Sequence, residues 1–166
     1  MGGAAARALA ALNFPVTGWS RSRKRIEGVD CLAGPEGLAT ALSRAAILVT
    51  LVPDTAETEN LLNADRLALL PEGAMIVNPG RGTLIDDAAL LDALDAGRIG
   101  HATLDVFRVE PLPPDHRYWA HPRVTVTPHI AATTHPDTAS AVVVENIRRA
   151  LAGEALLHRV DRGRGY

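Results

Sequence analysis

The chain has 166 residues, of which 47% are hydrophobic and 22% are charged, and its formal net charge at pH 7 is −2. The apolar fraction excludes a disordered chain, and no apolar run approaches the roughly 20 residues that a membrane span needs. The 17 basic residues nearly balance the 19 acidic ones, so the composition excludes a protein that binds nucleic acid through bulk positive charge.

The first 51 residues alternate between helical and strand-like patterns. We predict helices over residues 4–12 and 36–43, short strands over 15–19 and 29–32, and a polar basic loop over 20–25. The run Ala46–Leu51 is continuously apolar and contains β-branched residues. This pattern predicts a strand that is buried on both faces of a sheet.

The remaining residues continue the alternation. We predict helices over residues 64–70, 86–96 and 136–152, and strands over 74–78, 102–106 and 124–126. Asp86 can cap its helix and Gly97 can end it. Buried strands separated by helices predict an α/β fold, a doubly wound parallel sheet of the Rossmann type. Ligands bind such sheets at the carboxyl ends of the strands.

Two segments carry the pattern of a dinucleotide site. Gly2 and Gly3 precede an Ala-rich helix, as at the end of a glycine-rich phosphate turn, although a flexible terminus gives the same pattern. The loop Ser20–Arg25 holds four cations, two hydroxyls and no acid. An acidic residue there would bind the ribose hydroxyl of NAD, whereas arginines accommodate the 2′-phosphate of NADP. The alternative interpretation of this loop is a solvated basic surface.

Three polar residues follow predicted strands and together suit the reduction of a keto acid. Arg81 can bind a carboxylate, His129 can donate a proton, and Glu110 can hold the imidazole in its charged form. Taken singly, a surface Arg, a turn Glu and a loop His are the simpler interpretations. A metal site at His121, His129 and His135 matches no common ligand spacing, so we predict no metal.

Four motifs appear in a fixed order along the chain: Val49–Thr58, Asn78–Asp86, Leu104–Phe107 with Glu110-Pro111, and Thr127–Ala132. With them the chain resembles the nucleotide-binding domain of the D-isomer-specific 2-hydroxyacid dehydrogenases. The segments Trp19–Lys24 and Val160–Tyr166 look most like the glyoxylate/hydroxypyruvate reductase branch of that family.

The resemblance implies roles for individual residues. Arg81 would bind the substrate's carboxylate and carbonyl, His129 would be the acid/base and Glu110 its partner. Asp105 would face the nicotinamide carboxamide. The residues implied to bind the cofactor are Gly2, Trp19, Ser20, Arg21, Ser22, Arg23, Lys24, Val52, Pro53, Thr58, Pro79, Gly80, Asp105 and Ala131.

The chain also departs from the family pattern. It lacks the first strand of the nucleotide domain and the substrate domain, so residues 1–156 would form an incomplete NAD(P)-binding domain and residues 157–166 a tail. Because the first strand is central in this fold, we expect the strands at Val16 and Val29 to separate from that at Ile47. We therefore expect the isolated chain to lack dehydrogenase activity.

The favoured function is a reductase of glyoxylate, hydroxypyruvate or a similar 2-keto acid, with NADP as first choice and NAD as second. The alternative is a non-catalytic remnant of such an enzyme that self-associates through its long C-terminal helix. A phosphoglycerate dehydrogenase is disfavoured by the basic loop. We expect a cytoplasmic protein, because Cys31 is the only cysteine and no signal peptide is recognisable. We also expect a homodimer without nucleic-acid or membrane partners.

Overall fold

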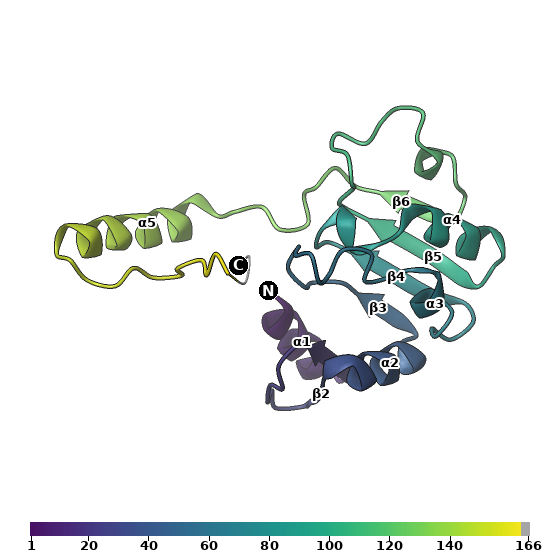
Figure 1. Cartoon of the computed structure of the whole chain (residues 1–166), viewed down its shortest axis with the longest axis horizontal. Helices are drawn as coiled ribbons and strands as arrows, with labels where there is room; N and C mark the ends of the chain where they lie inside the picture. The colour runs from purple at the N-terminus through teal and green to yellow at the C-terminus, as the bar shows by residue number, and fades with distance from the viewer. Residues whose placement is uncertain (164–166) are drawn as a thin grey trace. The chain divides into compact units, whose positions relative to one another are not determined.

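The computed structural model describes residues 1–163, and the chain divides into two compact units, Met1–His129 and Ile130–Tyr166. The first unit alternates strands and helices (Figure 1). Its elements are α1 (Gly2–Ala11), β1 (Val16–Ser20), β2 (Val29–Ala33), α2 (Gly34–Arg44), β3 (Ile47–Val49), α3 (Ala64–Leu67), β4 (Ala74–Asn78), the 3-10 helix η1 (Gly82–Leu84), α4 (Asp87–Asp95), β5 (Ile99–Leu104), the 3-10 helix η2 (Arg117–Trp119) and β6 (Val124–Val126).

The strands of the first unit are parallel to their neighbours and form two sheets. One sheet pairs β1 with β2, and the other has the order β3-β4-β5-β6. The separation of the strands at Val16 and Val29 from the strand at Ile47 is therefore confirmed. All four strands of the larger sheet present their carboxyl ends along one edge, because parallel strands share a direction.

The hydrophobic core lies on one face of the larger sheet. Leu90, Leu91 and Leu94 of α4 are buried, together with Ile76 of β4 and Leu104 of β5. Figure 1 shows α3 and α4 lying over this sheet. Helix α4 therefore gains its stability mainly from burial of its apolar side, at roughly 1.5–3 kcal/mol for each fully buried leucine.

The predicted ends of α4 are confirmed by hydrogen bonds and backbone angles. The Asp86 carboxylate accepts a hydrogen bond from the Ala89 N–H at 3.1 Å, which satisfies one N–H of the first turn. Gly97 follows the helix with a φ of +74°, a conformation that a glycine adopts without steric cost.

The prediction that the strand at Ala46–Leu51 is buried on both faces is wrong. β3 is only three residues long, and Ile47 and Val49 are 54% and 40% exposed. Met75, which pairs with Ile47 across the sheet, is exposed as well. The physical reason is that β3 is an edge strand with one paired neighbour, and within residues 1–163 this face of β3 and β4 stays open to solvent.

Other differences from prediction are small. α3 ends at Leu67 rather than at residue 70, β5 begins at Ile99 rather than at 102, and Ser20 is the last residue of β1. The short helices η1 and η2 carried no recognisable pattern. Their first residues follow Arg81 and His116, and a single 3-10 turn is too short for a hydrophobic period to develop.

The second unit consists of α5 (Pro136–Leu151) and the segment after it, of which residues 164–166 of the expected tail lie outside the described residues. Asn146 holds that segment to the helix through two hydrogen bonds with the Leu157 backbone. Hydrogen bonds from Arg148 and Arg149 lower the pKa of Glu145 to about 2. None of the helices within residues 1–163 has the length and apolar character needed to cross a membrane.

Candidate functional site

A pocket of about 310 Å³ lies at the carboxyl edge of the larger sheet. The loop after each of the four strands contributes residues to this pocket, as the parallel topology predicts. The lining residues are Asp54 after β3, Arg81, Gly82 and Thr83 after β4, Phe107, Arg108 and Glu110 after β5, and His129 after β6. Arg81, Glu110 and His129, singled out from the sequence, thus share one pocket.

His129 and Glu110 form a close pair. The His129 Nδ1 atom lies 2.7 Å from Glu110 Oε2, and Glu110 Oε1 accepts the Phe107 N–H at 2.9 Å. Partial burial works to raise the pKa of Glu110. The hydrogen bonds from His129 and Phe107 and the positive charge of Arg81 outweigh that effect, so the pKa of Glu110 lies below its usual value.

The ionised state of Glu110 fixes the roles of the two imidazole nitrogens. A carboxylate can only accept hydrogen bonds, so His129 Nδ1 carries a proton and donates it to Glu110. The other nitrogen, Nε2, is left to exchange a proton with a ligand. His129 also has a φ of +52°, a left-handed conformation that is uncommon for a residue with a side chain and often occurs at functional positions.

Arg81 is presented by a turn that the buried side chain of Asn78 organises. Asn78 Oδ1 accepts the Thr50 hydroxyl at 2.6 Å and the Gly80 N–H at 3.1 Å, while its Nδ2 donates to the Arg81 carbonyl at 2.9 Å. Sequence reasoning assigned no role to Asn78. A polar residue at the end of an otherwise apolar strand was the available signal, since a buried amide requires partners.

Gly82 brings the Arg81 turn against the loop that carries Glu110. A Cβ atom built on Gly82 would overlap the backbone of Phe107 and Arg108, so only glycine fits. The two loops are therefore in direct backbone contact at this point, which sets how closely Arg81 can approach Glu110.

We expect Gly82→Ala to destabilise the chain by about 1–3 kcal/mol, the usual cost of overpacking, because rigid backbone must move to admit the methyl group. Urea unfolding measures this difference. Gly3→Ala is the control, since its added Cβ would lie 3.6 Å from the Ile26 side chain, an ordinary contact within α1. Equal stability of Gly82→Ala and the parent chain would contradict the tight contact.

Asp105 is a buried carboxylate that follows β5. It accepts a hydrogen bond from the Thr127 hydroxyl at 2.5 Å, and its backbone N–H donates to the Asn78 carbonyl at 3.0 Å. These bonds connect the ends of β4, β5 and the loop after β6. Asp105 is thus held at the same edge of the sheet as Arg81, while its predicted contact with a nicotinamide stays a prediction.

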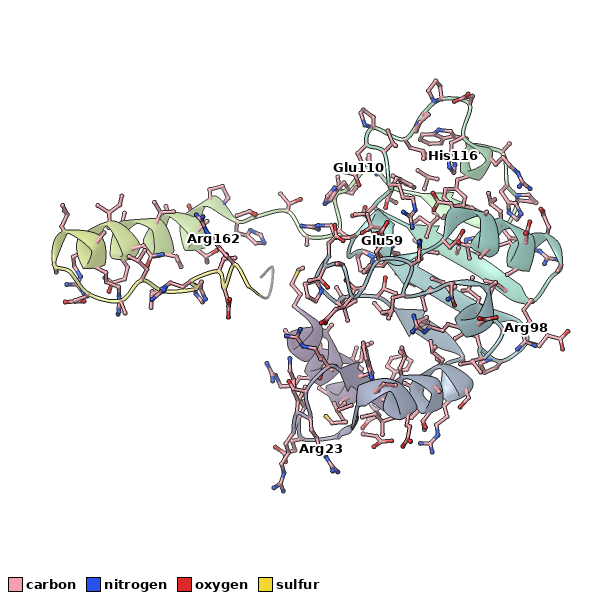
Figure 2. The ribbon with its side chains drawn as sticks, viewed as in Figure 1. Arg23, Glu59, Arg98, Glu110, His116 and Arg162 are labelled. Carbon is pink, nitrogen blue, oxygen red and sulfur yellow. The ribbon has the colours of Figure 1, made fainter. Side chains whose placement is uncertain are left out.

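The loop after β1 lies apart from this pocket. Figure 2 shows Arg23 far from Glu110 across the first unit. Arg21 forms an ion pair with Glu57 at 3.1 Å, and the Ser20 hydroxyl donates to the Ser22 carbonyl at 2.8 Å. A second pocket, of about 540 Å³, is lined by Arg23, Lys24, Arg25, Ile26, Val29, Asp30 and Cys31.

The remaining residues implied to bind a cofactor have varied surroundings. Trp19 packs against the core and donates its indole N–H to the Gly34 carbonyl at 2.8 Å. The Thr58 hydroxyl lies 2.7 Å from the Pro53 carbonyl oxygen and closes the turn after β3. Gly2 lies in the first turn of α1, Val52 packs against the core, and Pro79 and Gly80 lie in the turn after β4. Ala131 belongs to the second unit.

Comparison with known proteins places these features in a family. The family model of the D-isomer specific 2-hydroxyacid dehydrogenase NAD-binding domain matches residues 1–131. A D-isomer specific 2-hydroxyacid dehydrogenase from Xanthobacter autotrophicus Py2, solved in complex with NADPH and MES, is 52% identical with a TM-score of 0.97. The match covers 99% of this chain and 68% of that one.

Two other solved structures are similar over nearly all of this chain. An NADPH-dependent glyoxylate/hydroxypyruvate reductase from Sinorhizobium meliloti, in complex with NADP and sulfate, is 42% identical with a TM-score of 0.94; the match covers 99% of this chain and 54% of that one. A probable 2-hydroxyacid dehydrogenase from Rhizobium etli, in complex with NADP, HEPES and L(+)-tartaric acid, is 36% identical with a TM-score of 0.88, over 98% and 53% of the two chains. The chain thus spans about half to two thirds of these relatives, and it belongs to the D-isomer specific 2-hydroxyacid dehydrogenase family, of which it carries the NAD-binding domain.

Proposed function

We propose that the chain is the nucleotide-binding and catalytic part of an NADP-preferring reductase that converts 2-keto acids of the glyoxylate and hydroxypyruvate type to D-2-hydroxy acids. The observation that carries the proposal is the His129–Glu110 pair, 2.7 Å apart, in the same pocket as Arg81. Similarity to the Sinorhizobium meliloti glyoxylate/hydroxypyruvate reductase supports the choice of substrate class.

The three residues have complementary tasks in such a reduction. The Arg81 guanidinium makes one hydrogen bond within residues 1–163, to the Gly80 carbonyl at 2.7 Å, so most of its N–H donors remain for the carboxylate and keto oxygen of a substrate. His129 Nε2 gives a proton to the keto oxygen as the carbonyl carbon is reduced. Glu110 keeps the imidazole oriented and stabilises its positive charge. NADPH, when bound, supplies the hydride.

The residues present suit a phosphorylated dinucleotide. Helix α1 begins at Gly2, with no acidic residue in its first turn and no side-chain cap, so its positive N-terminal end suits a phosphate. Arg23, Lys24 and Arg25 supply positive charge in the pocket beyond β1. A Cβ on Gly80 would lie 2.8 Å from the Thr50 carbonyl oxygen, so that turn needs a residue without a side chain.

Arg21 and Arg23 should set the preference for NADPH over NADH. Replacing both by Ala should reduce that preference by a few kcal/mol at most, because hydrogen bonds to charged groups contribute about 1.5–3 kcal/mol each at best. Fluorescence titration of the chain with each reduced nucleotide measures the difference. Arg117→Ala, which removes an exposed arginine paired with Asp95, is the control. NADH binding as tight as NADPH binding in the parent chain would contradict the assignment.

Glu110→Gln should change the pH dependence of keto-acid reduction. The lowered pKa of Glu110 keeps it ionised throughout the neutral range, and its negative charge favours the protonated imidazole that donates the proton. The glutamine amide is uncharged, so Glu110→Gln removes a negative charge that lies 2.7 Å from the His129 imidazole. The pH above which reduction declines should therefore move to a lower value in steady-state assays. An unchanged profile would contradict the role of Glu110.

Because the relatives are longer, reductase activity is tested on two forms: the 166-residue chain and an extended chain, meaning this sequence with any in-frame coding sequence that precedes Met1. NADPH oxidation with glyoxylate and with hydroxypyruvate is followed for both. We expect activity in the extended chain. An extended chain that binds NADPH but reduces neither acid would contradict the proposed substrate class.

A self-associating, non-catalytic protein is the second candidate. The observation that favours it is the exposed apolar row on α5, formed by Val143, Val144, Ile147 and Leu151. Such residues on a helix commonly pack against another helix. Light scattering of the chain tests for the homodimer, which is compatible with either function.

The single cysteine supports a reducing compartment such as the cytoplasm.

A further inference from the structure

Arg108 lines the same pocket as Arg81, yet its guanidinium is used elsewhere. Its Nη2 donates to the carbonyls of Thr83 at 3.2 Å and Ile85 at 3.0 Å, and to the side-chain oxygen of Asn60. Its Nη1 lies 3.6 Å from a Glu59 carboxylate oxygen. Both N–H groups of Arg108 Nη2 are therefore used within the chain, and its Nη1 faces a carboxylate, whereas the Arg81 guanidinium makes a single hydrogen bond within residues 1–163.

The acceptors of Arg108 come from different segments than Arg108 itself. Thr83 and Ile85 belong to the turn that follows Arg81, whereas Arg108 stands two residues before Glu110. The side chain thus bridges the Arg81 turn and the Glu110 loop, at the place where Gly82 brings their backbones into contact. The backbone contact limits how close the loops come, and the Arg108 hydrogen bonds connect them at the same place.

The bridge is also connected to the rigid core. Arg108 Nε lies 3.9 Å from an Asp87 carboxylate oxygen at the start of α4, and the other oxygen of Asp87 accepts the Tyr118 hydroxyl at 2.8 Å. Burial of Tyr118 and the negative charge of Asp87 raise the pKa of the phenol, so it stays a hydrogen-bond donor. Asp87, one acidic partner of Arg108, is therefore itself held in position by Tyr118.

We propose that Arg108 is a positioning residue that holds the Phe107–Glu110 loop against the Arg81 turn and so sets the spacing between the Arg81 guanidinium and the His129–Glu110 pair. The inference rests on the proposed function, since one substrate must contact Arg81 and His129 together. A misplacement of about 1 Å in such a site can cost roughly 100-fold in rate.

The kinetic test compares two arginines that both hold backbone carbonyls. Arg108→Ala in the extended chain should lower kcat/KM for the keto acid by about 10- to 100-fold and leave the Kd of NADPH within about two-fold. Arg108→Lys should recover only part of the loss, because one ammonium group cannot replace a planar fork of donors.

Arg98→Ala is the matched control. Arg98 Nη2 donates to the carbonyls of Ala68 and Leu70, and Figure 2 shows Arg98 on a different side of the first unit from Glu59 and Glu110. Its loss should lower stability but keep kcat/KM within about two-fold. A kcat/KM of Arg108→Ala within about two-fold of the parent, or an equal loss in Arg98→Ala, would overturn the proposal.

A spectroscopic test uses the 166-residue chain and needs no activity. Arg108→Ala should move the ¹⁵N imidazole signals of His129 toward those of Glu110→Gln, whereas Arg98→Ala should leave them in place. Unchanged His129 signals in Arg108→Ala would overturn the positioning role even if the extended chain is an active reductase. Shifted signals in a chain without reductase activity would support it while the proposed function fails. If Arg108→Ala does not fold, Arg108→Lys is measured in the same way.

Discussion

Replacing His129 by Ala is expected to lower the turnover of keto-acid reduction in the extended chain by about 10²–10⁴-fold, the usual contribution of general acid–base catalysis. The reason is that, among residues 1–163, the pocket lining has a single imidazole, and Glu110 holds it. The loss should appear mainly in kcat, because in the proposed reaction His129 gives its proton to the keto oxygen as the reduction proceeds. Steady-state assays with saturating NADPH measure it.

His101→Ala is the control for this prediction. His101 lies in β5 outside the pocket lining, with its Nε2 atom 2.9 Å from the Thr125 hydroxyl oxygen. Its replacement should leave turnover near that of the parent enzyme. If His129→Ala retained near-normal turnover, another group would have to supply the proton and the assignment would be wrong.

Replacing Arg81 by Ala is expected to lower kcat/KM for the keto acid by about 10²–10⁴-fold, since two hydrogen bonds to a charged carboxylate contribute about 3–6 kcal/mol. Binding of NADPH should change little, because the cofactor's charged groups are assigned to α1 and the loop after β1. The kinetic measurement is therefore paired with a nucleotide titration of the same variant.

Arg81→Lys separates charge from geometry. A lysine keeps the positive charge but cannot bind a carboxylate with two parallel N–H donors, so it should recover only a minor part of the activity. Full recovery by lysine would mean that Arg81 acts as a simple point charge. An Arg81→Ala enzyme with normal kcat/KM would remove Arg81 from the substrate site.

Local patterns predicted those parts of the fold that depend on local physics. The Asp86 cap and the Gly97 stop of α4 were readable because capping involves residues only a few positions apart. Arg81, Glu110 and His129 could be assigned to one pocket because each follows a parallel strand, and such strands end along the same edge.

Features that depend on distant residues were not predictable. Whether Ile47 and Val49 are exposed depends on which other segments pack on that face of the sheet. Their apolar, β-branched sequence is the same as that of a strand buried on both faces. Arg108 escaped notice because its hydrogen-bond partners, such as Ile85 and Asn60, lie 23 and 48 residues away in the chain. The residues next to Arg108 in the sequence do not indicate these contacts.

The most direct test of the central claim is a crystal structure of the extended chain with NADP and oxamate, an unreactive analogue of a 2-keto acid. We expect the oxamate carboxylate to accept hydrogen bonds from Arg81, and its amide-carbonyl oxygen to lie within hydrogen-bond distance of His129 Nε2. The His129–Glu110 contact of 2.7 Å should be retained. Oxamate bound beside NADP but away from Arg81 and His129 would contradict the assignment of these two residues to the substrate site.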